Sequence, residues 1–225
     1  MSSPRTLAPS PSLHHLARRS AHADLDTMGA VLAAAFQDDP VFSWMVPDDA
    51  RRRTILPAAM RLFAARYQPH GQNHVTETGS GAAVWSPPGA TFAPADDERF
   101  EAELVALVGD DIAARAAELR ELLSDAHPHD PHHYLMLLGV APDHQGTGVG
   151  SALLHAVLDR ADRDSRHAYL AATSRRDRAL YERHGFEVTR ELRVSDCPPL
   201  WAMWRDPRSA WSPGARGRAS LSAVS

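Results

Sequence analysis

Apolar residues recur along this chain with two spacings, which predict a mixture of helices and strands. Spacings of three and four residues predict helices over residues 23–36, 48–67, 96–123, 148–164 and 174–184. Short apolar or alternating runs that end at turn-forming residues predict strands over residues 13–19, 73–78, 81–85, 134–140, 166–172, 186–194 and 200–204. These elements are enough for one compact domain of mixed helices and strands.

Glycine and proline mark where these elements break. Gly79–Ser80 predicts a two-residue hairpin turn between adjacent strands, and Pro57 predicts a kink or restart in the second helix. A short helical turn is expected over residues 40–45. The helical pattern over 96–123 is interrupted near residues 109–111, so a pair of helices is expected there. This pair either forms a wall of a substrate pocket or only covers one face of the sheet.

The two ends of the chain differ in composition from the part between them. Residues 1–12 are rich in Ser and Pro, and residues 207–225 are rich in Pro, Ser, Gly, Arg and Ala, which predicts disordered extensions around a domain at 13–206. No apolar run approaches the ~18 residues of a membrane span, and no signal-peptide pattern is present. We therefore expect a cytoplasmic protein that does not bind membranes.

Charge and residue usage exclude several classes of chemistry. The formal net charge of −4 argues against nucleic acid as an obligate partner. The single cysteine, Cys197, rules out an internal disulfide framework, and its position near Pro198 and Pro199 favours a structural role over a nucleophilic one. All 24 basic residues are arginine, which excludes a Schiff-base lysine.

One stretch, residues 134–154, carries the strongest chemical signal. A buried strand is followed by Ala141–His144, then by the glycine-rich segment Gln145–Gly150, and then by a helical pattern. A helix N-terminus leaves backbone N–H groups unpaired at the positive end of its dipole, so it suits an anionic phosphate. Glycines let such a ligand approach the backbone closely. The stretch predicts a site for a phosphate-bearing cofactor.

The residue sequence of this loop distinguishes between three known kinds of phosphate-binding site. A P-loop needs Gly-Lys-Ser/Thr, and the chain has no lysine. The dinucleotide fingerprint would need glycine at Ser151 and a tight turn directly after the strand. An acetyl-CoA motif, Gln/Arg-x-x-Gly-x-Gly/Ala after Val-x-Pro, is matched by Val140, Pro142, Gln145, Gly148 and Gly150. A glycine-rich turn without a ligand is the remaining alternative.

Four histidines, at positions 127, 129, 132 and 133, cluster before this stretch. Clustered histidines can bind metal. Pro128 and Pro131 interrupt the cluster, and neither a cysteine nor a spaced His pair completes a recognisable site. A solvated loop is therefore the favoured interpretation, and no metal is expected.

With these motifs in order, the chain resembles the GNAT N-acetyltransferase superfamily over roughly residues 13–206. Four segments carry the resemblance: 33–40 (AAAFQDDP), 81–85 (GAAVW), 140–154 and 181–186 (YERHGF). Their combination is most similar to the puromycin acetyltransferase-like actinobacterial members. The resemblance implies an α+β, three-layer fold. In this fold a mixed, mainly antiparallel sheet, flanked by helices, is splayed between its fourth and fifth strands, and acetyl-CoA lies in the split.

The resemblance also implies roles for particular residues in binding acetyl-CoA. The backbone of Leu138 and Val140 is expected to pair with the pantetheine arm, as an added strand would. The pyrophosphate is expected on backbone amides of the loop, namely Gln145, Gly146, Thr147, Gly148, Val149, Gly150 and Ser151. Ser174 replaces a pantetheine-binding asparagine of relatives. Arg175 or Arg176 could bind the 3′-phosphate of CoA. The alternative is that both are solvent-exposed residues at the start of the helix.

Tyr181 matches the tyrosine that protonates the departing CoA thiolate in this superfamily. With pKa values of ~8.5 for a thiol and ~10 for tyrosine, complete transfer is uphill by about 2 kcal/mol, which favours donation as the bond breaks. An amphipathic tyrosine packed near a helix end is the alternative. The base that deprotonates the amine is not identified by sequence, and Glu77, His133 and Tyr134 are candidates from strand placement alone.

The expected function is acetyl-CoA-dependent N-acetylation of a primary amine of a small molecule, by direct transfer in a ternary complex. The alternative is a non-catalytic acyl-CoA-binding or regulatory module with the same fold. Relatives often carry glutamate at position 171, where this chain has Ala171, and asparagine at position 177, where it has Asp177. The lost glutamate puts puromycin itself in doubt as the acceptor. The oligomeric state is left open between monomer and homodimer.

Overall fold

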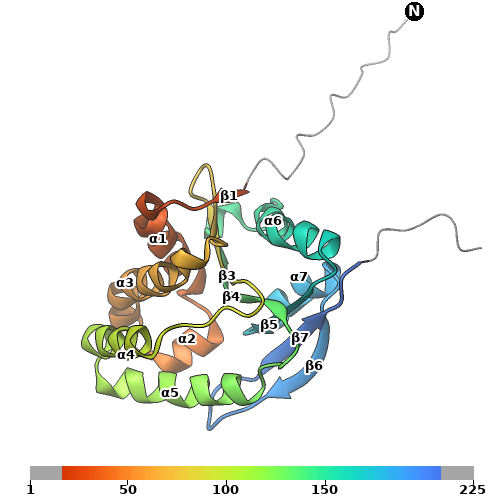
Figure 1. Cartoon of the computed structure of the whole chain (residues 1–225). Coiled ribbons are helices and arrows are strands. Elements are labelled where there is room, and N and C mark those ends of the chain that lie inside the picture. The colour runs from red at the N-terminus through yellow and green to blue at the C-terminus, as the bar shows by residue number, and fades with distance from the viewer. Residues whose placement is uncertain (1–16, 209–225) are drawn as a thin grey trace, which may run out of the picture.

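A computed structural model of the chain describes residues 17–208 and contains a seven-stranded sheet (Figure 1). The strands are β1 (Ala17–Arg19), β2 (His74–Thr76), β3 (Gly81–Ser86), β4 (His132–Val140), β5 (His167–Ala172), β6 (Glu187–Leu192) and β7 (Leu200–Arg205). The helices are α1 (Leu25–Phe36), α2 (Pro40–Met45), α3 (Asp49–Tyr67), α4 (Pro94–Val108), α5 (Asp110–Asp125), α6 (Val149–Arg163) and α7 (Arg175–Arg183). Short 3₁₀ turns cover His22–Asp24, Gln68–His70 and Pro142–His144.

The sheet is mixed, and its order is β1-β2-β3-β4-β5-β7-β6. Neighbouring strands run antiparallel except β4 and β5, which are parallel. Helix α6 connects these two parallel strands, as a crossover between parallel neighbours requires. The predicted fold class, a mainly antiparallel sheet flanked by helices, is confirmed.

Two separate layers of apolar side chains hold the helices on the two faces of the sheet. On one face α1 and α3 pack on β2 to β4 through Met28, Leu32 and Met60. On the other face α6 packs through Leu153 and Leu154, and α7 packs through Tyr181. Figure 1 shows α1 and α3 on one side of the strands and α6 on the other. The apolar residues whose spacing predicted these helices are the ones that pack on the sheet.

The parallel strands β4 and β5 pair only over their first residues. The ladder runs from His132↔His167 to Leu135↔Leu170 and then ends, while β5 continues to pair with β7 as far as Ala172. A β-bulge lies at the same level on the other edge of β4. Val84 of β3 pairs with Leu137, and the next residue, Trp85, pairs with Leu135, which leaves Met136 as the extra residue. The predicted splay between the fourth and fifth strands is therefore present.

Most predicted elements are found within two or three residues of their expected ends, with three differences. The turn between β2 and β3 covers residues 77–80 instead of two residues, because the N–H of Gly79 bonds the carbonyl of Thr76. Helix α3 continues through Pro57 without a break. Strand β4 begins two residues earlier, at His132. The predicted disordered ends, 1–12 and 207–225, and residues 13–16 of the first strand lie outside the described residues, except for Pro207 and Arg208. The backbone N–H of Arg208 donates to Oδ1 of Asp162 at 2.7 Å, so the described chain extends two residues past the predicted end of the domain.

The helices of the described chain were compared with the length and apolarity that a membrane span requires. No helix within residues 17–208 is both long and apolar enough to cross a bilayer.

Gly139 is required where helix α1 crosses β4. A Cβ at this position would lie 2.8 Å from the Cβ of Ala35 and 3.0 Å from Cδ2 of Leu32. We expect Gly139→Ala to lower the free energy of unfolding by about 1–3 kcal/mol through overpacking, as measured by urea denaturation. Gly150→Ala is the control, because its nearest neighbour, Leu180 Cδ2, is 3.4 Å away, and it should not lose stability. Equal stability of Gly139→Ala and the parent chain would contradict this packing argument.

Candidate active site

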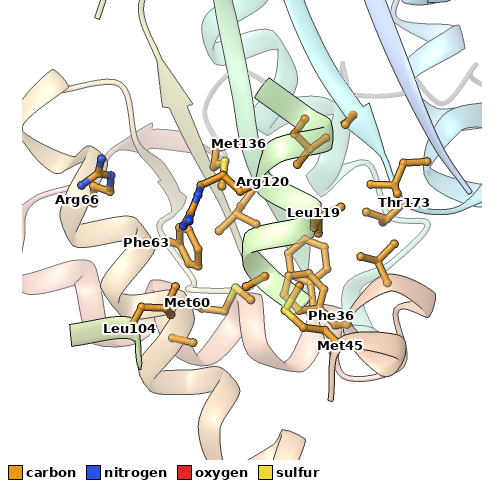
Figure 2. Close-up of a pocket in the computed structure, with 18 of the residues that line it drawn as sticks. Phe36, Met45, Met60, Phe63, Arg66, Leu104, Leu119, Arg120, Met136 and Thr173 are labelled. Carbon is orange, nitrogen blue, oxygen red and sulfur yellow. The ribbon is translucent and has the colours of Figure 1, made fainter. Parts of the chain in front are cut away.

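The split between β4 and β5 opens into a cavity of about 710 Å³. Its walls come from α1 to α5 and α7 as well as from the two strands, and they are mainly apolar. Figure 2 shows aromatic and sulfur-containing side chains, among them Phe36, Met60 and Phe63, pointing into this space. Leu104 of α4 and Leu119 of α5 also line it. The helical pair α4–α5 is therefore a wall of this cavity, which decides between the two roles that the sequence left open for it.

The glycine-rich loop lies at the end of β4, beside the split. Gly146 and Gly148 have φ values of 78° and 94°, in the left-handed region that favours glycine. Gly148 is the N-cap of α6, and the first backbone bond of the helix runs from the N–H of Ala152 to its carbonyl at 3.0 Å. The N–H groups of Val149, Gly150 and Ser151 therefore precede the first turn and have no acceptor within the helix.

Side chains of the loop brace its shape. The amide of Gln145 donates to the carbonyl of Val140 at 3.1 Å, and the hydroxyl of Thr147 donates to the carbonyl of His144 at 2.6 Å. The Gln145 side chain thus ties the loop back to the end of β4. This bracing role was not predicted from the sequence, which assigned Gln145 only to the backbone cradle.

Tyr181 lies on α7 with its side chain buried and facing the cavity. Its ring packs edge-on against Phe186, with centroids 6.0 Å apart. Burial raises the pKa of Tyr181 far above its ordinary value, and the nearby carboxylates of Asp177 and Asp39 raise it further. The phenol is therefore protonated throughout the working pH range and can donate a hydrogen bond into the cavity.

Ser174 begins α7 and uses its hydroxyl to do so. Its Oγ accepts from the N–H of Asp177 at 3.1 Å and donates to Oδ2 of the same residue at 2.6 Å. Ser174 is therefore the N-cap of α7, at the start of the helix that the apolar spacing predicted. Arg175 and Arg176, which follow, are exposed.

Asp39 is a site residue that was not predicted from the sequence. It is 8% exposed, and its Oδ1 accepts from the N–H groups of Val41 and Phe42 at the start of α2. Its Oδ2 accepts from the hydroxyl of Thr173 at 2.5 Å, and Thr173 lines the cavity. Burial raises the pKa of Asp39 above its ordinary value. The pair Asp39–Pro40 is typical of a helix N-cap and could have been recognised in the sequence. Its contact with Thr173, 134 positions away, arises only from the fold.

Of the three candidate bases, only Tyr134 lines the cavity. Glu77 is exposed in the turn after β2. His133 is buried elsewhere, with Nδ1 3.0 Å from Oε1 of Gln72. Strand placement alone was therefore misleading for these two residues, because Glu77 lies beyond the end of β2 and His133 faces Gln72 instead of the split.

The histidine cluster is not the solvated loop that was predicted, because only His129 is exposed. His127 lines the cavity and lies edge-on to Tyr134 and Tyr169, and its Nε2 is 3.1 Å from Nε2 of His132. Burial, and then the neighbouring His132, lower the pKa of His127 to about 4. Within residues 17–208 no three His, Cys, Asp or Glu side chains are grouped to hold a metal ion.

Cys197 is buried in the cluster formed by α2, β5 and β7. Burial raises the pKa of its thiol to about 11, so the reactive thiolate is scarce near neutral pH. The predicted structural role agrees with this placement.

Comparison with known proteins agrees with this geometry. A sequence model described as an acetyltransferase (GNAT) domain matches residues 103–188, which include α5, β4, the loop, α6 and α7. A solved Corynebacterium glutamicum structure, described as histone acetyltransferase HPA2 and related acetyltransferase, is 29% identical with a TM-score of 0.67. The match covers 86% of this chain and 96% of that chain.

More distant solved structures share the fold. An agmatine N-acetyltransferase is 18% identical with a TM-score of 0.57, covering 85% of this chain and 98% of that one. A Drosophila melanogaster polyamine N-acetyltransferase is 17% identical with a TM-score of 0.56, covering 85% and 99%. The split sheet, with its loop at the end of β4, is thus the fold of GNAT acetyltransferases.

Gly146 tests whether the loop is a ligand site. Gly146 and Gly71 both have left-handed backbones, and a Cβ added at either position would meet nothing within 4 Å. Alanine at either position should cost about 1–2 kcal/mol of stability. We expect only Gly146→Ala to weaken acetyl-CoA binding, by about tenfold in isothermal titration. Equal affinity of the two variants would remove the loop from the binding site.

The low pKa of His127 predicts acid sensitivity. The unfolded chain regains the ordinary value of 6.5, so between pH 6.5 and about 4 it takes up a proton that the folded chain does not. Stability should therefore fall as the pH is lowered through this window. Urea midpoints should fall less steeply in His127→Asn than in the parent chain. His129→Asn, at an exposed position, should keep the parent slope, and the same slope in both variants would contradict the prediction.

Proposed function

We propose that this chain, an N-acetyltransferase with a GNAT acetyltransferase domain, moves the acetyl group of acetyl-CoA directly to a primary amine of a small molecule. Both substrates are bound together in the proposed reaction, and no metal takes part.

The open edge of β4 is the observation that carries this proposal. Beyond Leu135, the strand pairs with β3 on one side, and its ladder with β5 has ended. Backbone N–H and C=O groups on such an edge need partners, and an extended amide-bearing chain can supply them as an added strand. The pantetheine arm is such a chain. We assign its contacts to the backbone of Leu138 and Val140.

The loop supplies the matching anion site at the end of this edge. Backbone amides from Gln145 to Ser151 are assigned to the pyrophosphate, and the loop itself contains no arginine. Compensation of its charge then rests on the unpaired N–H groups and the dipole of α6. Ser174 lies beside the arm in this assignment, with its hydroxyl shared with Asp177.

Tyr181 is assigned as the acid that protonates the CoA thiolate. Its raised pKa makes complete proton transfer more uphill than the ~2 kcal/mol expected for an ordinary tyrosine. The phenol therefore acts by hydrogen bonding to sulfur as negative charge develops and by donating its proton as the carbon–sulfur bond breaks.

The amine must lose a proton before it attacks. At pH 7 this costs on the order of 4–5 kcal/mol for an alkylammonium. The Thr173 hydroxyl already donates to buried Asp39, so its oxygen is free to accept from an amine in the cavity. We assign this pair to orient the amine and to receive its proton, directly or through water.

Within the superfamily, we infer a place among the puromycin acetyltransferase-like actinobacterial members. The order of the segments at 33–40, 81–85, 140–154 and 181–186 supports it. Asp39 belongs to the first of these segments, so its contact with Thr173 gives that segment a physical role.

Tyr181→Phe tests the assignment of the acid. Loss of the hydroxyl should lower kcat by about 100-fold or more, measured by thiol release, because proton donation contributes on this scale. The dissociation constant for acetyl-CoA, measured by titration, should change by less than about threefold, which is under 1 kcal/mol.

Tyr67→Phe is the matched control, since Tyr67 is another largely buried tyrosine that lines the same cavity. It should keep kcat within about threefold of the parent chain. If Tyr181→Phe retains the turnover of the parent chain, the acid is another group. Acetyl-CoA binding without turnover on any amine would instead favour a non-catalytic binding module.

A further inference from the structure

We propose that the acceptor is an amphipathic monoamine: a primary amine with one large apolar group, either aryl or alkyl, and no second positive charge. This inference rests on the proposed function and adds to it the chemical class of the acceptor. Three features of the cavity carry it: its apolar middle, an acidic end beside Tyr181, and an opposite end where every charge is paired.

The middle of the cavity suits an apolar group. Phe36, Met60, Phe63, Leu104 and Leu119 face it from four helices. Its volume of about 710 Å³ exceeds what a pantetheine arm at the split would fill on its own. Methionine side chains adapt their shape to a ligand, and aromatic side chains provide large contact areas. A polar acceptor would leave this surface in contact with water or would be desolvated without partners.

The end beside Tyr181 suits an ammonium group. Asp177 lines the cavity here, and the Thr173 hydroxyl lines it with Asp39 behind. Both carboxylates act on Tyr181 electrostatically, so both lie close to the proposed point of transfer. Among the described residues, the arginines that line the cavity are Arg66 and Arg120, and Figure 2 shows Arg66 and Thr173 at opposite ends. An ammonium group is therefore drawn to the Tyr181 end.

The far end offers no free carboxylate to a second cation. Its two lining acids are Asp97 and Glu101, and each forms an ion pair with an arginine, Arg66 and Arg120 respectively. Arg66 also lies over the ring of Phe100, 4.4 Å from its centroid. A diamine that reached this end would place its second ammonium beside two guanidinium groups. The arrangement selects against polyamines and guanidino amines.

Matched amines test the inference with the full chain and acetyl-CoA, by thiol release. The probes are linear monoamines from propylamine to octylamine, 2-phenylethylamine, and the α,ω-diamine of each length. We expect kcat/KM to rise about fourfold per methylene until the cavity is filled, since burial of one CH₂ is worth that factor. Each longer diamine should fall at least about tenfold below its monoamine, because its second ammonium would lie near Arg66 and Arg120, whose carboxylate neighbours are already in ion pairs.

A variant that fills part of the cavity tests whether the dependence of kcat/KM on amine length arises in the cavity. Ala116 lines the cavity from α5, whereas Ala117, the next residue on the helix, is exposed and does not line it. Ala116→Leu should lower kcat/KM for octylamine and 2-phenylethylamine by about tenfold or more and leave propylamine unchanged. Ala117→Leu adds the same side chain at a neighbouring position and should change neither.

Asp177→Asn tests the acidic end. Asparagine keeps an oxygen that can accept from Ser174, so the start of α7 is preserved. The loss of charge should lower kcat/KM for all monoamines by a similar factor, about tenfold, and should leave both the length dependence and acetyl-CoA affinity intact. An unchanged kcat/KM would overturn the assignment of this end to the ammonium group.

The remaining outcomes separate this inference from the proposed function. The inference of an apolar acceptor would be overturned if diamines were turned over as fast as monoamines, or if kcat/KM did not depend on amine length. The proposed N-acetylation would stand in either case. Loss of octylamine turnover in Ala117→Leu as well as Ala116→Leu would show that the cavity does not hold the alkyl chain. Thiol release with none of the amines would overturn both proposals together.

Discussion

The separation of β4 from β5 after Leu135 and Leu170 is the constraint on which the rest of this structure depends. Two parallel strands that part in the middle of a sheet leave backbone donors and acceptors on their facing edges. The fold keeps them apart by giving each a different second neighbour: β3 holds β4, with the bulge at Met136, and β7 holds β5. The helices then turn the gap into a usable site, because α6 begins at the end of β4 and α7 begins at the end of β5. The glycine-rich loop and the buried Tyr181 thereby flank the same opening.

The cavity beyond the split has a charge layout that follows from which groups are paired. At its far end, acids and arginines of α3, α4 and α5 neutralise one another. At the Tyr181 end, Asp39 accepts from two backbone N–H groups and a threonine hydroxyl, and Asp177 accepts from a serine hydroxyl. Neither carboxyl group forms an ion pair with an arginine of the described chain. The two ends of the cavity therefore differ in charge. This layout supports the proposed acceptor, whose charge lies at the Tyr181 end and whose apolar group occupies the larger volume.

Burial decides the protonation of the groups around this cavity. Desolvation keeps Tyr181 protonated and His127 neutral, so both are uncharged near neutral pH. The neutral His127 adds an aromatic surface to the wall and no repulsion toward a bound ammonium group. The same burial makes the histidine a source of acid sensitivity, because protonation in the unfolded chain is then favoured. Acid sensitivity and the proposed selection of the acceptor thus both depend on the same apolar lining.

The sequence by itself determined the elements, the glycine-rich loop and the helical position of Tyr181, because these depend on local backbone preferences and on spacing within a few residues. Gly109 and Gly148 have positive φ where the chain pattern placed a helix break and a helix start. Only the tertiary structure decided which side chains face the split. Asp39 and Thr173 lie far apart in sequence but form a hydrogen bond. His127 lines the cavity and contacts the buried His132, whereas Glu77 is exposed and His133 faces Gln72. These outcomes depend on strand register, on the bulge at Met136 and on helix crossings such as that at Gly139, which arise from long-range packing and have no local signal in the sequence.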